Sequence, residues 1–124
     1  MAKYMMKLML LFALLLLLGC GIKQPTPAEL DNAYYGPEPE NYQEIIKNYM
    51  RLVLIDPVSA LYEFPNSPRK VWVNRHGQIE YGWGLVCLIN AKNRMGGYTG
   101  FQSHQFVICN GTVIAYGNFQ AGYK

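Results

Sequence analysis

Two cysteines and two histidines are the residues of this chain best suited to nucleophilic or metal chemistry. Cys87 and Cys109 lie within apolar runs, His76 lies in a predicted turn, and His104 begins a predicted strand. A Cys–His nucleophile pair needs an accessible thiol near an imidazole, whereas a thiol in an apolar run behaves as a small hydrophobe. No CxxC or HxxxH spacing starts a zinc site. We therefore predict no enzyme activity, no metal site and no cofactor; a thiol-dependent enzyme stays an alternative.

A second group of residues lies in segment 91–101, Ala-Lys-Asn-Arg-Met-Gly-Gly-Tyr-Thr-Gly-Phe, between two predicted strands. It exceeds a normal hairpin loop, and long loops are often functional. Its cations and aromatics could grip an anion or a glycan, but it lacks the helix and the Gly-Lys-Ser/Thr ending of a phosphate loop. Alternatively, its glycines shape the turn while its aromatic residues pack on the sheet. The candidate binding residues are Lys92, Asn93, Arg94, Tyr98 and Phe101.

The first nineteen residues predict an export signal. Residues 1–7 form a basic start, and the apolar stretch 8–18 would rise only about 16 Å as a helix, against a hydrocarbon core of about 30 Å. A signal peptide is therefore expected rather than a lasting span. The following Leu17-Leu18-Gly19-Cys20 resembles the lipobox of bacterial lipoproteins. The alternative is an uncleaved anchor with an incidental cysteine.

The lipobox resemblance implies cleavage after Gly19 and a diacylglyceryl group on Cys20. Membrane lipid is then a partner, and the three acyl chains usual in this class are enough for stable anchoring. Residue 21 is Gly rather than the Asp that often retains lipoproteins in the inner membrane. We therefore expect a lipid-anchored protein of the cell envelope, on the outer membrane facing the periplasm if the cell is Gram-negative.

Charge is unevenly distributed in the mature chain. Of eleven Lys and Arg residues, Lys3 and Lys7 leave with the signal, so nine remain against eight acidic residues. Segment 20–44 is acidic, and segment 45–124 carries a basic surplus. That surplus could favour an anionic membrane surface, or it could be ordinary surface charge. We expect no nucleic-acid partner.

The mature chain divides into three predicted parts: a Pro-rich, acidic, extended tether at 20–40, a domain at 41–120 and a C-terminal tail at 121–124. Tyr34 and Tyr35 could pack back on the domain. A helix is predicted from Asn41, as N-cap with Glu44 completing a capping box, to about Leu54 or Ile55. Asp56 is expected to cap a short turn through Ser59. The apolar face of the helix consists of Tyr42, Ile45, Ile46, Tyr49, Leu52 and Val53, of which Ile46 and Leu52 are expected to be buried.

From residue 61 the apolar period changes to two, which indicates strands at 61–64, 70–74, 79–90, 104–109 and 112–116. His76-Gly77 and Asn110-Gly111 predict hairpin turns, the second because both its positions need φ > 0. The expected fold is α+β: one N-terminal amphipathic helix packed on an antiparallel meander sheet of four to five strands.

Export to an oxidising compartment would leave Cys87 and Cys109 as two thiols, which favours a disulfide. A loop symmetric about Gly96, however, places Cys87 opposite Gln105 and Cys109 opposite Trp83. The cysteines are then roughly 13 Å apart along the strand, beyond the limit of about 7 Å for a disulfide. We predict two free, buried thiols. A bulge or an asymmetric loop would bring the cysteines closer, and a disulfide is then the alternative.

Three motifs resemble a group of small bacterial secreted proteins and lipoproteins of unknown function: DPVSALYEF at 56–64, YGWGLVC at 81–87, and NAKN with GGYTG in 90–100. The resemblance implies an envelope location and no particular activity. We expect a non-enzymatic binding or structural module acting on an envelope protein partner. The alternative is a surface-interaction protein that modulates phage or plasmid entry.

Overall fold

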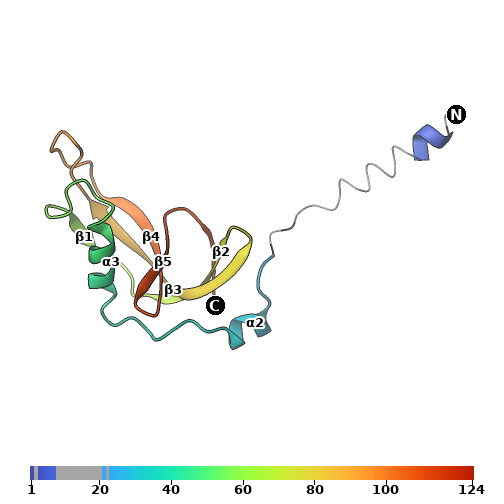
Figure 1. The fold of residues 1–124 in the computed structure, drawn as a ribbon, viewed down its shortest axis with the longest axis horizontal. Coiled ribbons are helices and arrows are strands. Elements are labelled where there is room, and N and C mark those ends of the chain that lie inside the picture. Colours follow the sequence, from blue (N-terminus) through green and yellow to red (C-terminus); the bar gives the residue numbers. More distant parts are fainter. Residues whose placement is uncertain (2, 8–20, 22) are drawn as a thin grey trace.

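The computed structural model describes residues 1, 3–7, 21 and 23–124. Residues 3–7 are helical, and the helices α2 (Pro27–Asn32) and α3 (Tyr42–Met50) follow. The strands are β1 (Leu61–Glu63), β2 (Arg69–Arg75), β3 (Gln78–Asn90), β4 (Gln102–Cys109), β5 (Thr112–Tyr116) and β6 (Gln120–Tyr123). They pair antiparallel in the order β5-β4-β3-β2-β6, and β1 pairs with the end of β3 that β2 does not reach (Figure 1). The predicted α+β class is confirmed, with six strands rather than four to five.

The sheet carries two apolar clusters, one on each face, and the long strand β3 pairs with β1, β2 and β4 at its centre. On one face α3 contributes Ile46 and Met50, which pack on Leu85, Cys87, Ile89, Phe106 and Ile108. On the other face Val71, Val73, Val107 and Ala115 form a second cluster with Ile114 and Phe119. Burial of these two sets of side chains is the main driving force that holds the sheet in shape.

Two hairpin turns form where the sequence predicted them, at His76-Gly77 and Asn110-Gly111. His76 and Gly77 have φ of 53° and 85°, and Asn110 and Gly111 have φ of 50° and 72°. Paired positive φ values match the twist of the flanking strands, so both turn predictions are confirmed.

Helix α3 differs from its prediction at both ends. Asn41 is the N-cap, but its side chain makes no cap hydrogen bond, so the predicted capping box is wrong. The helix ends at Met50 because the next amides, of Leu52 and Val53, bond to the carbonyls three residues earlier. Such bonds tighten the turn and rotate it relative to an α-helix. Leu52 is therefore 88% exposed, contrary to its predicted burial, and Met50 is buried instead.

The segment expected to be an extended tether has more structure than predicted. Residues 27–32 form α2, which has a capping box between Thr26 and Glu29 and begins with Pro27 at its first position, where proline is well tolerated. The expectation of extended chain is therefore wrong for these six residues. No helix in the described ranges has the length and apolar character that a membrane crossing requires.

Residues 33–40, the strap, run along the sheet between α2 and α3 (Figure 1). Tyr35 is buried against Tyr81, and its hydroxyl donates to the Leu30 carbonyl. The Trp83 indole donates to the Gly36 carbonyl at 3.0 Å. The prediction that this segment packs back on the domain is confirmed for Tyr35.

Strand β6 was not predicted. Residues 120–123, mostly the expected C-terminal tail, pair with β2 from Val71 to Asn74. Gly122 lies against the Trp72 indole with no room for a Cβ. A four-residue strand containing a glycine has too weak an alternation to be recognised in the sequence.

Candidate functional site

The 91–101 segment forms a small hairpin of its own, shaped by Asn93. The Asn93 side-chain oxygen accepts hydrogen bonds from the amides of Met95 and Gly97 at 2.9 and 3.1 Å, and its backbone pairs with Gly96 and Gly97. Asn93 was predicted as a binding residue, but its carboxamide is engaged within the turn. The alternative interpretation holds for the turn, where Gly96 has φ of 80°, but Phe101, which it expected to pack on the sheet, is 45% exposed.

Tyr98 ties this hairpin to the rest of the domain, and Lys92 packs on Tyr98 within the hairpin. The Tyr98 hydroxyl donates to the Ser59 carbonyl at 2.9 Å, and the Lys92 ammonium lies 5.2 Å from the centre of the Tyr98 ring. Tyr98 therefore packs toward segment 51–60 rather than lying flat on the sheet. Arg94 and Phe101 remain exposed.

Segment 51–60 is itself held by a side-chain cap. The Asp56 carboxylate accepts from the Ser59 amide at 3.3 Å and from the Ser59 hydroxyl at 2.7 Å, as the sequence predicted. These bonds lower the pKa of Asp56, so the carboxylate is charged at neutral pH.

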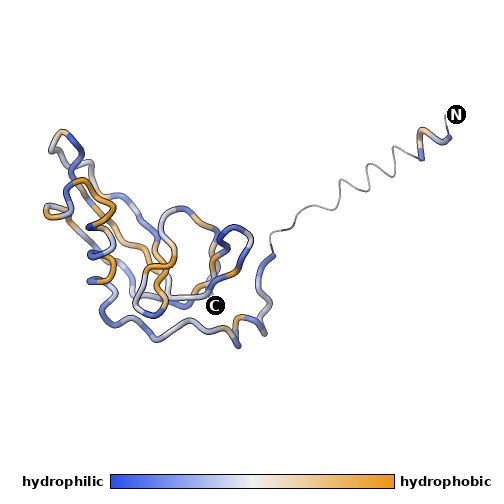
Figure 2. Tube along the Cα trace, in the orientation of Figure 1, coloured by the Kyte–Doolittle hydropathy of each residue, from blue (hydrophilic) through white to orange (hydrophobic). Residues whose placement is uncertain are grey.

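Together these two segments form an apolar end of the domain, which we call the distal surface. Figure 1 places it at the end of the domain away from α2, and Figure 2 shows apolar residues along the chain after α3. Val58 is 95% exposed and Met95 92% exposed. The apolar side chains of the distal surface are Leu52, Ile55, Val58, Leu61, Met95 and Phe101. Single exposed apolar residues are ordinary, whereas contiguous apolar patches are typical of interaction surfaces.

A groove of about 520 Å³ opens beside α3 at this end. We call it the α3 groove; it is lined by Lys47, Arg51, Pro57, Val58, Ala60 and Tyr62. The Lys47 ammonium lies 5.7 Å from the Tyr62 ring centre and 6.0 Å from that of Phe64. These residues are not among the candidates predicted from the sequence, because their gathering depends on where α3 ends and on the turn that follows.

The cations of the α3 groove are not neutralised by carboxylates of the described chain. The ion pairs within residues 1, 3–7, 21 and 23–124 are Arg75–Glu80 and Lys124–Asp31, both outside this groove. Lys47 and Arg51 lie four residues apart, which places them as neighbours on one side of α3. The groove therefore offers two adjacent positive charges beside an apolar wall.

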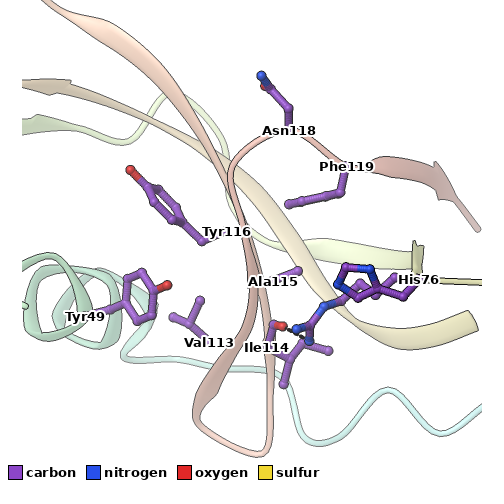
Figure 3. Close-up of a pocket in the computed structure, with 9 residues that line it drawn as sticks. Tyr49, His76, Val113, Ile114, Ala115, Tyr116, Asn118 and Phe119 are labelled. Atoms are coloured by element: carbon purple, nitrogen blue, oxygen red, sulfur yellow. Dashed lines mark hydrogen bonds between the residues drawn. The ribbon is translucent and has the colours of Figure 1, made fainter. Parts of the chain in front are cut away.

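A second groove, of about 440 Å³, runs along the edge strand β5 (Figure 3). Its one guanidinium, of Arg75, is engaged by the Ile114 carbonyl and by Glu80. Figure 3 shows the polar ends of Tyr116 and Asn118 directed away from His76. Because its polar groups do not converge on one point, this groove is a weaker candidate than the α3 groove.

Of the cysteines and histidines predicted as candidates for chemistry, Cys87 and His104 are cross-strand neighbours on β3 and β4, whereas His76 lies in the turn between β2 and β3. Both cysteines were predicted to be free and buried: each is a free thiol in the described chain, but Cys87 is buried whereas Cys109 is only partly buried. Groups of three or more metal-ligating side chains do not occur among the residues that the structure describes. Cys20, the predicted lipid attachment site, lies outside the described residues.

Comparison with known proteins finds no match: neither a family model, nor a curated protein, nor a solved structure matches the chain. The motif resemblance to small envelope proteins therefore stays a prediction.

Proposed function

We propose that this protein is a lipid-anchored, non-enzymatic binding module of the bacterial cell envelope, which holds a partner protein at its distal surface. The observation that carries the proposal is the exposure of large aliphatic side chains on two segments that are tied to each other. Val58 and Met95 stand on different loops, and the Tyr98–Ser59 hydrogen bond fixes those loops together. A preformed apolar surface loses little conformational entropy when a partner covers it.

The anchoring half of the proposal is supported by the sequence. The basic start, the eleven-residue apolar stretch and Leu17-Leu18-Gly19-Cys20 occur in the order that lipoprotein export requires. Mass spectrometry of the membrane-extracted protein should show loss of residues 1–19 and an acylated Cys20. A Cys20→Ser variant that remained fully processed and anchored would contradict this half.

The non-enzymatic half is supported by the state of the thiols. Burial raises the pKa of Cys87 to about 11 and also raises that of Cys109. Thiols that stay protonated at neutral pH are poor nucleophiles. Binding, rather than covalent chemistry, is what the exposed residues of the distal surface can do.

In-cell photo-cross-linking tests the binding proposal. Benzoylphenylalanine replaces Val58 or Met95 of the full-length protein, and Gln120, an exposed position on β6, serves as the control. We expect one protein adduct of discrete mass from both distal positions and none from position 120. Equal labelling at all three positions, or no adduct at any, would overturn the proposal. The captured protein distinguishes a resident envelope assembly from a phage or plasmid entry component.

A further inference from the structure

We infer that the α3 groove recognises an acidic segment of the partner, flanked by aliphatic residues. This inference rests on the proposed function, since it names the chemistry by which a partner of the distal surface is selected. The observation behind it is that two cations, Lys47 and Arg51, line the same groove as an apolar wall.

The cations are arranged for carboxylates. Lys47 and Arg51 are separated by one helical turn, and like charges at this spacing repel each other. A carboxylate that enters between them relieves this repulsion and gains charge-assisted hydrogen bonds. Arginine binds carboxylate through two parallel bonds, which gives direction to the contact.

The opposite wall of the groove is apolar and contains no acidic residue. Pro57, Val58, Ala60 and Tyr62 line it. The neighbouring carboxylate of Asp56 does not line the groove and is engaged by Ser59. An aliphatic side chain next to the bound carboxylate would therefore contact Val58, and its neighbours would reach Leu52. The volume of about 520 Å³ lies in the range of ordinary ligand pockets, about 300–1,000 Å³.

The position of the groove favours a peptide over the anchoring membrane. Six residues, 21–26, follow Cys20 before α2 begins, and fully extended they reach about 20 Å. A domain of about 100 residues has a radius of gyration of about 13 Å, so its width exceeds that reach. Because α2 and the distal surface lie at opposite ends (Figure 1), anchoring near α2 directs the groove away from that membrane.

The test measures how the Val58 adduct depends on the groove charges. Benzoylphenylalanine is placed at position 58 of the full-length protein, alone and together with Lys47→Gln and Arg51→Gln. The matched control carries Lys23→Gln and Arg69→Gln, which remove the same net charge at exposed positions outside the groove and the distal surface. We expect the adduct yield to fall about tenfold in the groove variant and less than about twofold in the control. Fragmentation of the adduct should place the cross-link within a few residues of an Asp or Glu that has aliphatic neighbours.

Each other outcome counts against one proposal or both. An adduct that ignores the groove charges, or that maps to a segment without carboxylates, overturns this inference and leaves the proposed function standing. A phospholipid adduct at position 58 assigns the groove to a lipid surface and overturns it too. Absence of any adduct at positions 58 and 95 removes the proposed function itself. Circular dichroism confirms that each variant is folded, and its recovery in the membrane fraction confirms that it is exported.

Discussion

Cys87 and His104 lie directly opposite each other on β3 and β4. Paired residues share a face of the sheet, with Cβ atoms about 4.5–5.5 Å apart, so this is the juxtaposition that a thiol–imidazole nucleophile would need. The thiol, however, is completely buried beneath α3, and the imidazole Nδ1 lies 3.0 Å from the Tyr116 hydroxyl, on whose ring it stacks. Cys87 therefore belongs to the core, and the partly buried His104 lies beside it.

The first prediction concerns the reactivity of Cys87. Burial raises the pKa of its thiol to about 11, so roughly one molecule in a thousand carries the thiolate at pH 8. We expect iodoacetamide to alkylate Cys87 at least about a hundredfold more slowly in the native protein than in concentrated guanidinium chloride. Peptide mass mapping reads each cysteine separately, with the partly buried Cys109 as the internal comparison. Equal native and denatured rates at Cys87 would show that the thiol is accessible.

The second prediction concerns His104 and pH. Burial lowers the pKa of His104 below its ordinary value of 6.5. As the pH falls below about 6.5, the unfolded chain binds a proton that the folded chain still excludes, so the free energy of unfolding decreases until the folded pKa is passed. The urea midpoint should therefore decrease from pH 7.5 to 5.5, and His104→Gln should show a smaller decrease. His76→Gln, at an exposed turn, is the control; the same pH dependence in both variants would rule out His104 as the cause.

The register of β3 and β4 shows where sequence reasoning stops. A symmetric loop predicted Cys87 opposite Gln105, which is wrong by one residue. Lys92 pairs with Tyr98, and β3 and β4 then pair from Ile89 and Gln102. Between these two pairs the side that leads into β4 has one residue more than the side that follows β3. Gly100, with φ of 92° and its amide bonded to the Asn90 side chain, accommodates that residue. The bulge depends on side-chain bonds that local patterns do not reveal.

The strands and turns that could be predicted are those with long alternating runs or Asn-Gly and His-Gly turns. The candidate site was predicted only in part. Tyr98 lies at the distal surface, but the α3 groove depends on Arg51 and Val58, which meet because the helix ends four residues earlier than its apolar periodicity indicates. The end of a helix is set by competing tertiary contacts, here the burial of Met50, as much as by propensity.

The corrected end of α3 makes a third prediction. Ile46 is completely buried under the sheet, so Ile46→Ala should lower the free energy of unfolding by about 2–5 kcal/mol. Leu52→Ala, at a similarly large aliphatic residue outside the core, should change it by no more than about 0.5 kcal/mol. Urea unfolding of the two variants gives both values. A large loss for Leu52→Ala would restore the longer helix that the sequence predicted.

The last prediction concerns the close contact between Gly84 on β3 and Val71 on β2. A Cβ at position 84 would lie 2.7 Å from both methyl groups of Val71, and overpacking of this kind costs about 1–3 kcal/mol. Gly84→Ala should therefore be destabilising, whereas Gly97→Ala should change stability by no more than about 0.5 kcal/mol, since the nearest atom to its Cβ is 3.8 Å away.

Removing the two methyl groups of Val71 tests whether their contact with the new Cβ causes the loss of stability, rather than a general sensitivity of β3 to substitution. Val71→Ala leaves a cavity and is itself destabilising, but in that background the new Cβ at position 84 no longer meets the two methyl groups, and the Cβ of residue 71, at 3.2 Å, is its nearest neighbour. The double variant should therefore be more stable than the sum of the two single changes predicts, by an interaction energy of about 0.5–3 kcal/mol. Urea unfolding of the four proteins closes the cycle. If the two changes add, then Val71 does not lie against Gly84, and the sheet is less tightly closed on this face than the structure has it.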